Sequence, residues 1–311
     1  MGVRMSTVER PVIVAGYDGS ATAQQAVMWA AAEAASRNFG LVVVQAVSLP
    51  ALPEMASTPA GWVTPQFNVD EQQALLGHAD SELESVAAAC RKAHPGLDVT
   101  PRAVSGRGPE TLAQIASDAQ LLVIGPSGRT ALPRALLGST AAELMHTYRR
   151  PIVIVRHPAE QPDGKRVVVG VDGSQTSTNA IDFAFDFADR HGYDLLAVHA
   201  WSDLPLDALA PVRTWDYAWQ DIHEKGERMF AESLAGHRQR HPNVDVRQVI
   251  SPDRPTHALL EHAQDAALLV VGSHGRGMLK RALLGSVSHA VAYHAPCPVA
   301  IVRPPEDPEA E

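Results

Sequence analysis

Two stretches decide the fold of this chain: VIVAGYDGS at residues 12–20 and VVVGVDGS at residues 167–174. Each is a short run of β-branched and small residues that ends in Asp-Gly-Ser. Three further stretches recur: LLVIG at 121–125 with LLVVG at 268–272, RALLGS at both 134–139 and 281–286, and PIVIVR at 151–156 with PVAIVR at 298–303. Because a period of about 150 residues is far longer than a solenoid repeat, the chain is predicted to hold two copies of one domain.

Strand-like and helix-like segments alternate within each copy. In the first copy we expect strands at Val12–Ala15, Leu41–Val47, Val99–Val104, Leu121–Ile124 and Ile152–Val155, and helices at Ala21–Arg37, Glu82–Lys92, Pro109–Ser117 and Arg134–Tyr148. Most of the strand-like runs are short and unbroken rather than alternating, and Val12–Ala15, Leu121–Ile124 and Ile152–Val155 are apolar throughout. This is typical of strands buried on both faces of a parallel sheet. Buried helix segments remain an alternative, but the Gly, Asp and Ser residues around these runs favour strands. The alternation predicts a doubly wound α/β fold.

The length of 311 residues fits two domains. We expect one domain at 1–158 and one at 159–311, with a linker at about 157–164 that contains Pro158 and Pro162. The last residues, 306–311, form an acidic tail that is expected to be solvated rather than to bind a ligand.

Composition excludes several classes of protein. The net charge of -9, without a basic run, gives no electrostatic footprint for nucleic acid. No apolar run approaches the ~20 residues of a membrane span, and the short polar start predicts no signal peptide. We therefore expect a cytoplasmic protein that does not bind membranes. The two cysteines, Cys90 and Cys297, have no CxxC partner, so neither a disulfide framework nor a zinc site is expected.

A glycine-rich pattern follows the fourth expected strand in both copies. The first copy has Gly125-Pro126-Ser127-Gly128, nine residues, then Gly138-Ser139, and the second has Gly272-Ser273-His274-Gly275, nine residues, then Gly285-Ser286. Glycines let the backbone approach an anion and take positive φ, and successive N–H groups form an anion-binding nest. A helix that begins at the Gly-Ser pair adds free N–H donors and the positive end of its dipole. The pattern predicts a polyphosphate site, although a tight turn kept for fold geometry remains the alternative.

Other catalytic and metal-binding patterns are missing from the sequence. It contains no GxxxxGK[ST], no complete GxGxxG after a strand, no HExxH and no GxSxG. The pairs His237/His241 and His257/His262 lie in polar helical stretches without matching acidic or cysteine ligands. We therefore predict no metal site and assign no catalytic residue.

With these motifs in place, the chain resembles tandem-domain universal stress proteins of the ATP-binding type, which carry G-2x-G-9x-G-S/T. The resemblance spans Val12 to Arg303. It implies two tandem doubly wound domains, each a five-stranded parallel sheet in the order 3-2-1-4-5 with helices on both faces. In that order the chain reverses between strands 1 and 4, and ligands of open α/β sheets bind at such a switch point.

The resemblance also implies roles for individual residues. Asp18 and Asp172 would bind ribose or adenine, Ala46 and Ala200 would offer backbone to the adenine, and the glycine-serine motifs would hold ribose and phosphates. For the two aspartates, helix capping is the alternative. The complete set of expected nucleotide contacts is Gly16, Asp18, Ala46, Gly125, Gly128, Arg129, Gly138, Ser139 and Thr140 in the first copy, and Gly170, Asp172, Ala200, Gly272, Gly275, Arg276, Gly285, Ser286, Val287 and Ser288 in the second.

The copies differ within the motif. Pro126 stands where the second copy has Ser273, and a proline lacks the backbone donor. Ala141 and Pro133 stand where the second copy has Ser288 and Lys280. We predict that the second site binds nucleotide more tightly.

Three classes of function follow. The first is an ATP-binding, nucleotide-responsive regulator in stress or dormancy adaptation, and the second is a slow ATPase or another adenine-nucleotide-dependent enzyme. The third is an interaction module without nucleotide. Binding is favoured over turnover because no carboxylate lies near the phosphate motif in both copies, while hydrolysis needs a positioned base. The motif does not separate ATP from ADP or AMP, and Mg²⁺ would come with the nucleotide.

The fifth strands, Ile152–Val155 and Val299–Val302, are expected to be β-branched edge strands. Exposed edges of this kind seek a partner. The family resemblance implies that they pair, so we predict an intrachain pseudo-dimer of the two domains and, beyond it, a homodimer of chains.

Overall fold

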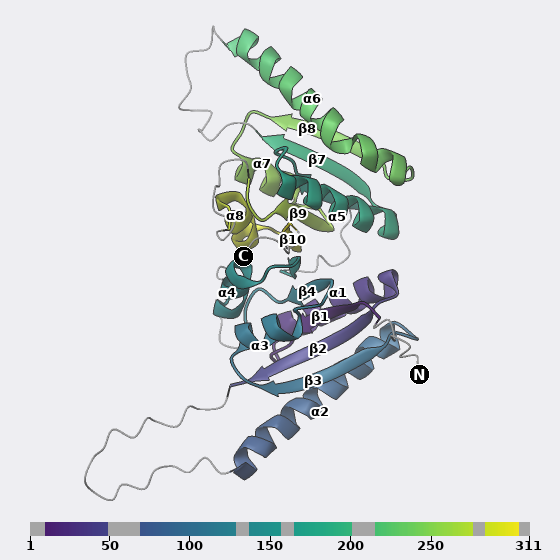
Figure 1. The fold of residues 1–311 in the computed structure, drawn as a ribbon, viewed down its shortest axis with the longest axis vertical. Helices are drawn as coiled ribbons and strands as arrows, with labels where there is room; N and C mark the ends of the chain where they lie inside the picture. Colours follow the sequence, from purple (N-terminus) through teal and green to yellow (C-terminus); the bar gives the residue numbers. More distant parts are fainter. Residues whose placement is uncertain are drawn as a thin grey trace, which may run out of the picture.

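The structure is a computed structural model of the chain, and it describes residues 10–48, 69–128, 137–156, 165–200, 215–275 and 284–304. Two similar halves follow one another along the long axis of the molecule (Figure 1). The first half contains β1 (Val12–Gly16), α1 (Ala21–Arg37), β2 (Gly40–Val47), α2 (Val69–Ala93), β3 (Val99–Ser105), α3 (Gly108–Ile115), β4 (Leu121–Ile124), α4 (Ser139–Thr147) and β5 (Ile152–Ile154).

The second half repeats this order. It contains β6 (Arg166–Gly170), α5 (Gln175–His191), β7 (Asp194–Ala200), α6 (Trp215–Arg240), β8 (Val246–Ser251), α7 (Pro255–His262), β9 (Leu268–Gly272), α8 (Ser286–His294) and β10 (Val299–Val302). The expected elements are present with small shifts at their ends. The larger differences are α2, which begins well before Glu82, and α4, which begins at Ser139. Residues 134–136, expected in that helix, lie outside the described residues, as do the expected linker 157–164 and tail 306–311.

The ten strands of the described residues form one sheet, in the order β3-β2-β1-β4-β5-β10-β9-β6-β7-β8. Each half has the predicted order 3-2-1-4-5, and every pairing within a half is parallel. The prediction of two doubly wound units is confirmed. In both units the chain reverses between the first and fourth strands, so β1 beside β4, and β6 beside β9, are the switch points of the sheet.

The two halves meet at the fifth strands, as the family resemblance implied. β5 pairs antiparallel with β10, with Ile154 opposite Val299 and Ile152 opposite Ile301. Val153 and Ala300, which occupy equivalent positions in the two repeats, face each other. An approximate two-fold axis therefore passes between these two residues and relates the halves.

Apolar side chains fill both faces of the sheet. Successive residues of β1 point to opposite faces, so Ile13 and Ala15 join the core under α1, α2, α5 and α6, while Val14 joins the core under α3, α4, α7 and α8. Each core contains residues of both repeats, so each hydrophobic layer continues across the β5–β10 junction. This explains the unbroken apolar runs of the sequence, because strands covered on both faces need no polar side.

Local signals set the ends of the first helix in each repeat. Ser20 accepts a hydrogen bond from the Ala23 N–H at 3.1 Å, and Ser174 accepts one from the Ser177 N–H at 3.2 Å. Both serines are therefore N-caps, a position at which serine is favoured. The helices end at Asn38 and Gly192 in the left-handed conformation, with φ of 56° and 64°.

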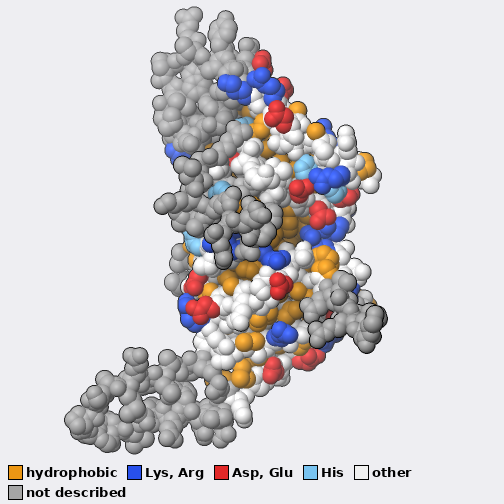
Figure 2. Space-filling model, viewed as in Figure 1, with side chains coloured by type: hydrophobic (Ala, Val, Ile, Leu, Met, Phe, Trp, Pro, Cys, Tyr) orange, Lys and Arg blue, Asp and Glu red, His pale blue; other side chains and the backbone are white. Residues whose placement is uncertain are grey.

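Charges of both signs are interspersed on the face shown in Figure 2. Among the helices of the described residues, none combines the length and the hydropathy that a bilayer crossing requires.

Candidate functional site at the ends of β1 and β4

The Asp-Gly-Ser turns connect the first strand of each repeat to the following helix. Gly19 and Gly173 have φ of 82° and 73°, a conformation that side chains with a Cβ rarely adopt. Asp18 Oδ1 accepts a hydrogen bond from the Ser20 N–H at 3.0 Å. In the second repeat Asp172 Oδ1 accepts from both the Ser174 N–H at 2.9 Å and the Ser174 hydroxyl at 2.6 Å. Each carboxylate is thus held at the carboxyl end of the strand by one of its two oxygens.

The loop after the fourth strand lies directly against the start of the first helix. A Cβ at Gly125 would lie 3.2 Å from the backbone of Thr22 and Ala23. At Gly272 the corresponding approach to the backbone of Thr176 is 2.9 Å. Only glycine leaves room for this contact, so the first motif glycine lets the β4 loop, or the β9 loop, close onto the helix.

The second motif glycine touches the aspartate of its own repeat. A Cβ at Gly128 would lie 2.5 Å from Asp18 Oδ2, and one at Gly275 would lie 2.6 Å from Asp172 Oδ2. The carboxylate and the loop backbone therefore meet, although 110 residues of sequence separate Asp18 from Gly128. The structure brings together the two motifs that the sequence placed at one switch point.

The third motif glycine joins the loop to the next helix. Gly138 N–H donates to the Pro126 carbonyl, and Gly285 N–H donates to the Ser273 carbonyl, both at 2.7 Å. Ser139 and Ser286 are the first residues of α4 and α8, and both are exposed. The N-termini of α1 and α4, and likewise of α5 and α8, therefore converge on one loop, and their free N–H groups and dipoles favour an anion there.

The reason for the motif glycines differs from the one expected. None of the six has a positive φ. They are required for close approach, to a helix backbone, to a carboxylate and to the loop itself. The expectation that they take positive φ is wrong for these positions, and it holds instead for Gly19 and Gly173.

Two site residues were missed by the sequence reasoning. The Thr22 hydroxyl donates to the Ser127 carbonyl at 2.8 Å, and the Thr176 hydroxyl donates to the His274 carbonyl. Each threonine fastens the glycine loop to the first helix of its repeat. The signal was present, because the pattern Asp-Gly-Ser-x-Thr recurs at 18–22 and 172–176.

The structure corrects two of the three arguments that ranked the second site above the first. The Ser273 N–H donates to the Val302 carbonyl at 2.8 Å, so this donor is used within the sheet and Pro126 removes no free donor from the first site. The Ser288 hydroxyl donates to the Gly272 carbonyl at 2.7 Å and is buried. Because a hydroxyl has one proton, Ser288 supports the loop and does not offer that proton to a phosphate. Pro133 and Lys280 lie outside the described residues.

The remaining expected residues lie at the ends of strands or in the first turns of helices, or fall outside the described residues. Gly16 and Gly170 leave room for Leu112 and Leu259 of α3 and α7, so their small size serves packing at the strand ends. Ala46 and Ala200 are half-buried near the ends of β2 and β7, and Thr140 and Val287 are half-buried in the first turns of α4 and α8. Arg129 and Arg276 lie outside the described residues.

A carboxylate lies on the helix that begins at the motif in the first repeat. Glu143, in α4, accepts a hydrogen bond from Arg107 at 3.0 Å, and Arg107 also donates to Glu110. The equivalent position in α8 is Ala290. Across the described ranges no group of three His, Cys, Asp or Glu side chains could hold a metal ion.

Comparisons with known proteins agree with this geometry. The model of the universal stress protein family matches residues 10–156 and again residues 164–303. A universal stress protein of Mycobacterium tuberculosis is 39% identical over 312 residues, covering 95% of this chain and 96% of the relative. Another, from Mycolicibacterium smegmatis, is 37% identical over 296 residues, covering 94% and 97%.

Among solved structures, a universal stress protein from Archaeoglobus fulgidus superposes with a TM-score of 0.66 at 19% identity. The superposition covers 94% of this chain and 98% of that one, so the tandem fold is shared over nearly the whole length. The two family matches coincide with the two halves of the sheet. The chain belongs to the universal stress protein family.

Proposed function

We propose that each repeat binds one adenine nucleotide, with ATP as the ligand, and that nucleotide occupancy makes the protein a regulator in stress or dormancy adaptation. The main support is that, in each repeat, the Asp-Gly-Ser turn after the first strand touches the glycine loop after the fourth strand. Asp18 Oδ2 and Asp172 Oδ2 abut Gly128 and Gly275, beside the N-terminus of a helix. An anionic group and a set of backbone donors side by side suit a ligand with both hydroxyls and phosphates.

The chemistry of each part supports a nucleotide rather than a free anion. A carboxylate accepts hydrogen bonds from ribose hydroxyls or an exocyclic amine, and it repels a phosphate placed directly on it. The N–H groups at the start of α4 and α8 bind phosphate oxygens. Membership of the universal stress protein family supports a role in the response to stress.

The residues around the site favour binding without rapid turnover. Phosphoryl transfer requires a group that positions the attacking water and cations at the γ-phosphate. Glu143 is occupied by Arg107 and has no acidic counterpart in the second repeat. We therefore propose a nucleotide-binding regulator and keep slow hydrolysis as the alternative that the same experiment tests.

The test is direct identification of the ligand. Protein purified without added nucleotide is denatured, and the released small molecules are identified by mass spectrometry. The nucleotide-free protein is then titrated with ATP, ADP and AMP, with and without Mg²⁺, by calorimetry. We expect two equivalents of ATP per chain and no phosphate release on the timescale of the titration. Absence of any adenine nucleotide in both experiments would reject the proposal, and motif-dependent phosphate release would favour the ATPase.

Three further expectations remain proposals. Residues 1–158 and 159–311 are proposed as the two domains, and the cytoplasm is the proposed compartment. A homodimer is also proposed, but the fifth strands no longer support it, because β5 and β10 pair with each other. Among the described residues the outermost strands are β3 and β8, so these edges are the ones that remain open to a second chain. Light scattering would measure whether the protein is a monomer or a dimer.

A further inference from the structure

In both repeats an arginine follows the fifth strand. PIVIVR ends at Arg156 and PVAIVR ends at Arg303. Because β5 and β10 are antiparallel neighbours, each strand carries its arginine into the opposite half of the molecule. The two arginines are therefore placed to act on the domain to which they do not belong.

Their contacts are reciprocal. Arg156 Nη1 donates to the Ala292 carbonyl at 3.0 Å and also to the Tyr293 carbonyl, both in the last turn of α8. Arg303 Nη2 donates to the Met145 carbonyl in the last turn of α4. Met145 and Ala292 occupy equivalent positions in the two repeats, so the same contact is made twice across the two-fold axis.

These carbonyls are groups that a helix cannot satisfy by itself. The last four carbonyls of an α-helix lack an N–H partner from the next turn. In α4 the final helical bond runs from the Tyr148 N–H to Leu144, and in α8 it runs from the Ala295 N–H to Val291. The arginines bond the very next carbonyls, and their positive charge lies at the negative end of each helix dipole.

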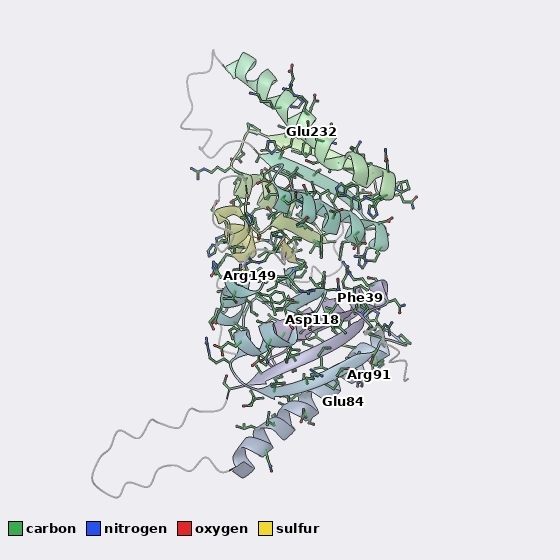
Figure 3. The ribbon with its side chains drawn as sticks, in the orientation of Figure 1. Phe39, Glu84, Arg91, Asp118, Arg149 and Glu232 are labelled. Atoms are coloured by element: carbon green, nitrogen blue, oxygen red, sulfur yellow. The ribbon has the colours of Figure 1, made fainter. Side chains whose placement is uncertain are left out.

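Burial shows that these are not casual surface contacts. Arg303 is only 6% exposed. Burial, together with the neighbouring Arg149 guanidinium, lowers the pKa of Arg303 to about 10, and burial also lowers the pKa of Arg156. Arg149 lies at the junction of the two halves (Figure 3). The fold thus keeps one buried cation, Arg303, and one half-buried cation, Arg156, at this junction despite the cost of burying charge.

The two capped helices also contact each other. The rings of His146 in α4 and His289 in α8 lie 6.1 Å apart between centroids. Figure 1 likewise shows α4 and α8 next to each other where the halves meet. The opposite ends of these same helices, at Ser139 and Ser286, carry the candidate phosphate sites.

We infer that Arg156 and Arg303 are reciprocal positioning residues: Arg303 holds the anion-binding helix of the first domain, and Arg156 holds that of the second. The inference rests on the proposed nucleotide function. It adds that the affinity of each site depends on a side chain of the other domain, so neither site is complete within its own repeat.

The short length of α4 explains how the arginine can influence the site. Met145 follows Ser139 by six residues, so the cap lies about 9 Å along the helix axis from the candidate phosphate site. A helix this short moves as a rigid rod, so a shift at one end moves the N–H groups at the other.

The experiment measures each site alone in the full-length protein. Gly275→Val leaves only the first site and Gly128→Val leaves only the second, since each valine would collide with the aspartate of its own site. Arg156→Met and Arg303→Met are then made in both backgrounds, with Arg→Lys at each position to restore the charge, and ATP affinity is measured by calorimetry. Arg150→Met is the matched control, because Arg150 is also near the end of α4 but donates to Ala119 of its own domain.

A crossed pattern is expected. Arg303→Met should weaken ATP binding at the first site by about threefold to tenfold and leave the second within about twofold, while Arg156→Met should do the reverse. Lysine should restore part of the loss, and Arg150→Met should change neither site. Hydrogen exchange without nucleotide should show faster exchange in α4 for Arg303→Met and in α8 for Arg156→Met, which guards against general misfolding.

Other patterns overturn the inference. Losses that follow the arginine's own domain, equal losses at both sites, or no loss would each reject it while leaving the proposed function intact. Wild-type protein that binds no nucleotide would instead reject the proposed function, and this inference with it.

Discussion

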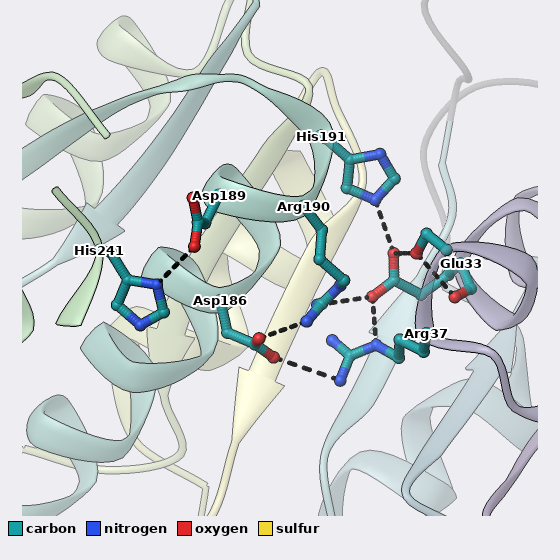
Figure 4. Close-up of polar contacts among 8 residues, drawn as sticks. Glu33, Arg37, Asp186, Asp189, Arg190, His191 and His241 are labelled. Atoms are coloured by element: carbon teal, nitrogen blue, oxygen red, sulfur yellow. Dashed lines mark hydrogen bonds and ion pairs between the residues drawn. The ribbon is translucent and has the colours of Figure 1, made fainter. Parts of the chain in front are cut away.

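The two repeats share a sheet and a binding motif, but they differ at the position where α1 meets α5. Glu33 of α1 is buried, and the equivalent residue of α5 is Phe187, also buried. Glu33 accepts hydrogen bonds from Arg190 at 3.1 Å, from His191 at 2.8 Å and from Arg37 (Figure 4). Phe187 stacks on Trp29, with centroids 6.0 Å apart and rings nearly parallel. One face of the junction is therefore asymmetric, while the α4–α8 face keeps the reciprocal arginine caps.

This difference shows what a tandem chain permits. In a two-fold homodimer every contact across the interface is made twice, so Glu33 and its partners would each appear twice. A covalent duplication lets one repeat supply the carboxylate and the other supply Arg190 and His191. The Glu33 contacts between α1 and α5 can therefore favour the pairing of a first half with a second half over the pairing of two identical halves. The symmetric α4–α8 face keeps the same arginine contact for both candidate sites.

The largest expected effect comes from removing the Glu33 charge. Glu33→Gln removes the buried carboxylate that Arg37 and Arg190 share and leaves both guanidiniums with the more exposed Asp186. Breaking a buried ion pair costs about 3–5 kcal/mol, so with Asp186 still in place we expect a loss of about 3 kcal/mol. Chemical denaturation should show that loss. Glu84→Gln is the control, because Glu84 and Arg91 form an exposed pair at 2.7 Å (Figure 3), worth less than about 1 kcal/mol. Equal losses of stability in the two variants would show that Glu33 and its contacts with Arg190 and His191 do not stabilise the junction of the two halves.

The same carboxylate predicts a loss of stability in acid. Burial alone would raise the pKa of Glu33, but the His191 hydrogen bond and the charges of Arg37 and Arg190 outweigh it and lower the pKa from 4.5 to about 2. The stabilisation is thus complete above pH 4.5 and is lost as the pH falls through about 2. At about 1.4 kcal/mol for each pKa unit, it amounts to roughly 3 kcal/mol.

Denaturation of wild type and Glu33→Gln at several pH values tests whether the stabilisation by Glu33 is lost as the pH falls. Other carboxylates titrate in the same range in both proteins, so the difference between the two is the quantity to follow. The difference should shrink as the pH falls from about 5 toward about 2. A difference that stays constant with pH would show that Glu33 is not ionised in the native protein.

The next effect separates the two binding sites. Gly128→Val and Gly275→Val each place a side chain where an aspartate oxygen lies, at 2.5 Å and 2.6 Å from the Cβ position. We expect each to weaken ATP binding at its own site by about a hundredfold, close to ~3 kcal/mol, so that calorimetry finds one equivalent in place of two. Gly77→Val is the control, because nothing lies within 4 Å of its Cβ. Retention of two equivalents in both motif variants would place the ligand elsewhere.

Much of the fold could be predicted because its signals are local. The apolar runs and the recurrence of whole stretches indicate ten strands, and the family resemblance supplied their order. The pairing of the fifth strands was also expected, from their β-branched edges and from that resemblance. The Glu33 network was not, because nothing local to Glu33 reveals that Arg190 and His191 of another repeat surround it.

The site was predicted in its parts and not in its hydrogen bonds. The strand order implied by the family resemblance placed Asp18 and Gly128 at one switch point, and the structure brings them together. Nothing in the sequence indicates that the Ser273 N–H is used by Val302 or the Ser288 hydroxyl by Gly272. Which partner a polar group takes depends on neighbours that only the folded sheet supplies.

The smallest effect concerns which site binds more tightly. We still predict the second, on a different ground: its loop and its aspartate are fixed by more hydroxyls. Ser288 holds the Gly272 carbonyl and Ser174 holds Asp172, whereas Ala141 replaces Ser288 in the first repeat. A site held in its binding geometry beforehand loses less entropy on binding.

Two sets of substitutions test this ranking by calorimetry in the single-site backgrounds. Ser288→Ala should weaken the second site by about threefold, the value of one lost neutral hydrogen bond in a supporting position. Gly285→Ala should cost more affinity than Gly138→Ala. A Cβ at Gly285 would lie 3.1 Å from the His274 Cα and 3.5 Å from the Ser288 hydroxyl that holds the loop, whereas one at Gly138 would lie 3.2 Å from the Ser127 Cα. If Gly138→Ala costs more, or if Ser288→Ala leaves the second site unchanged, the hydroxyls do not set the affinity.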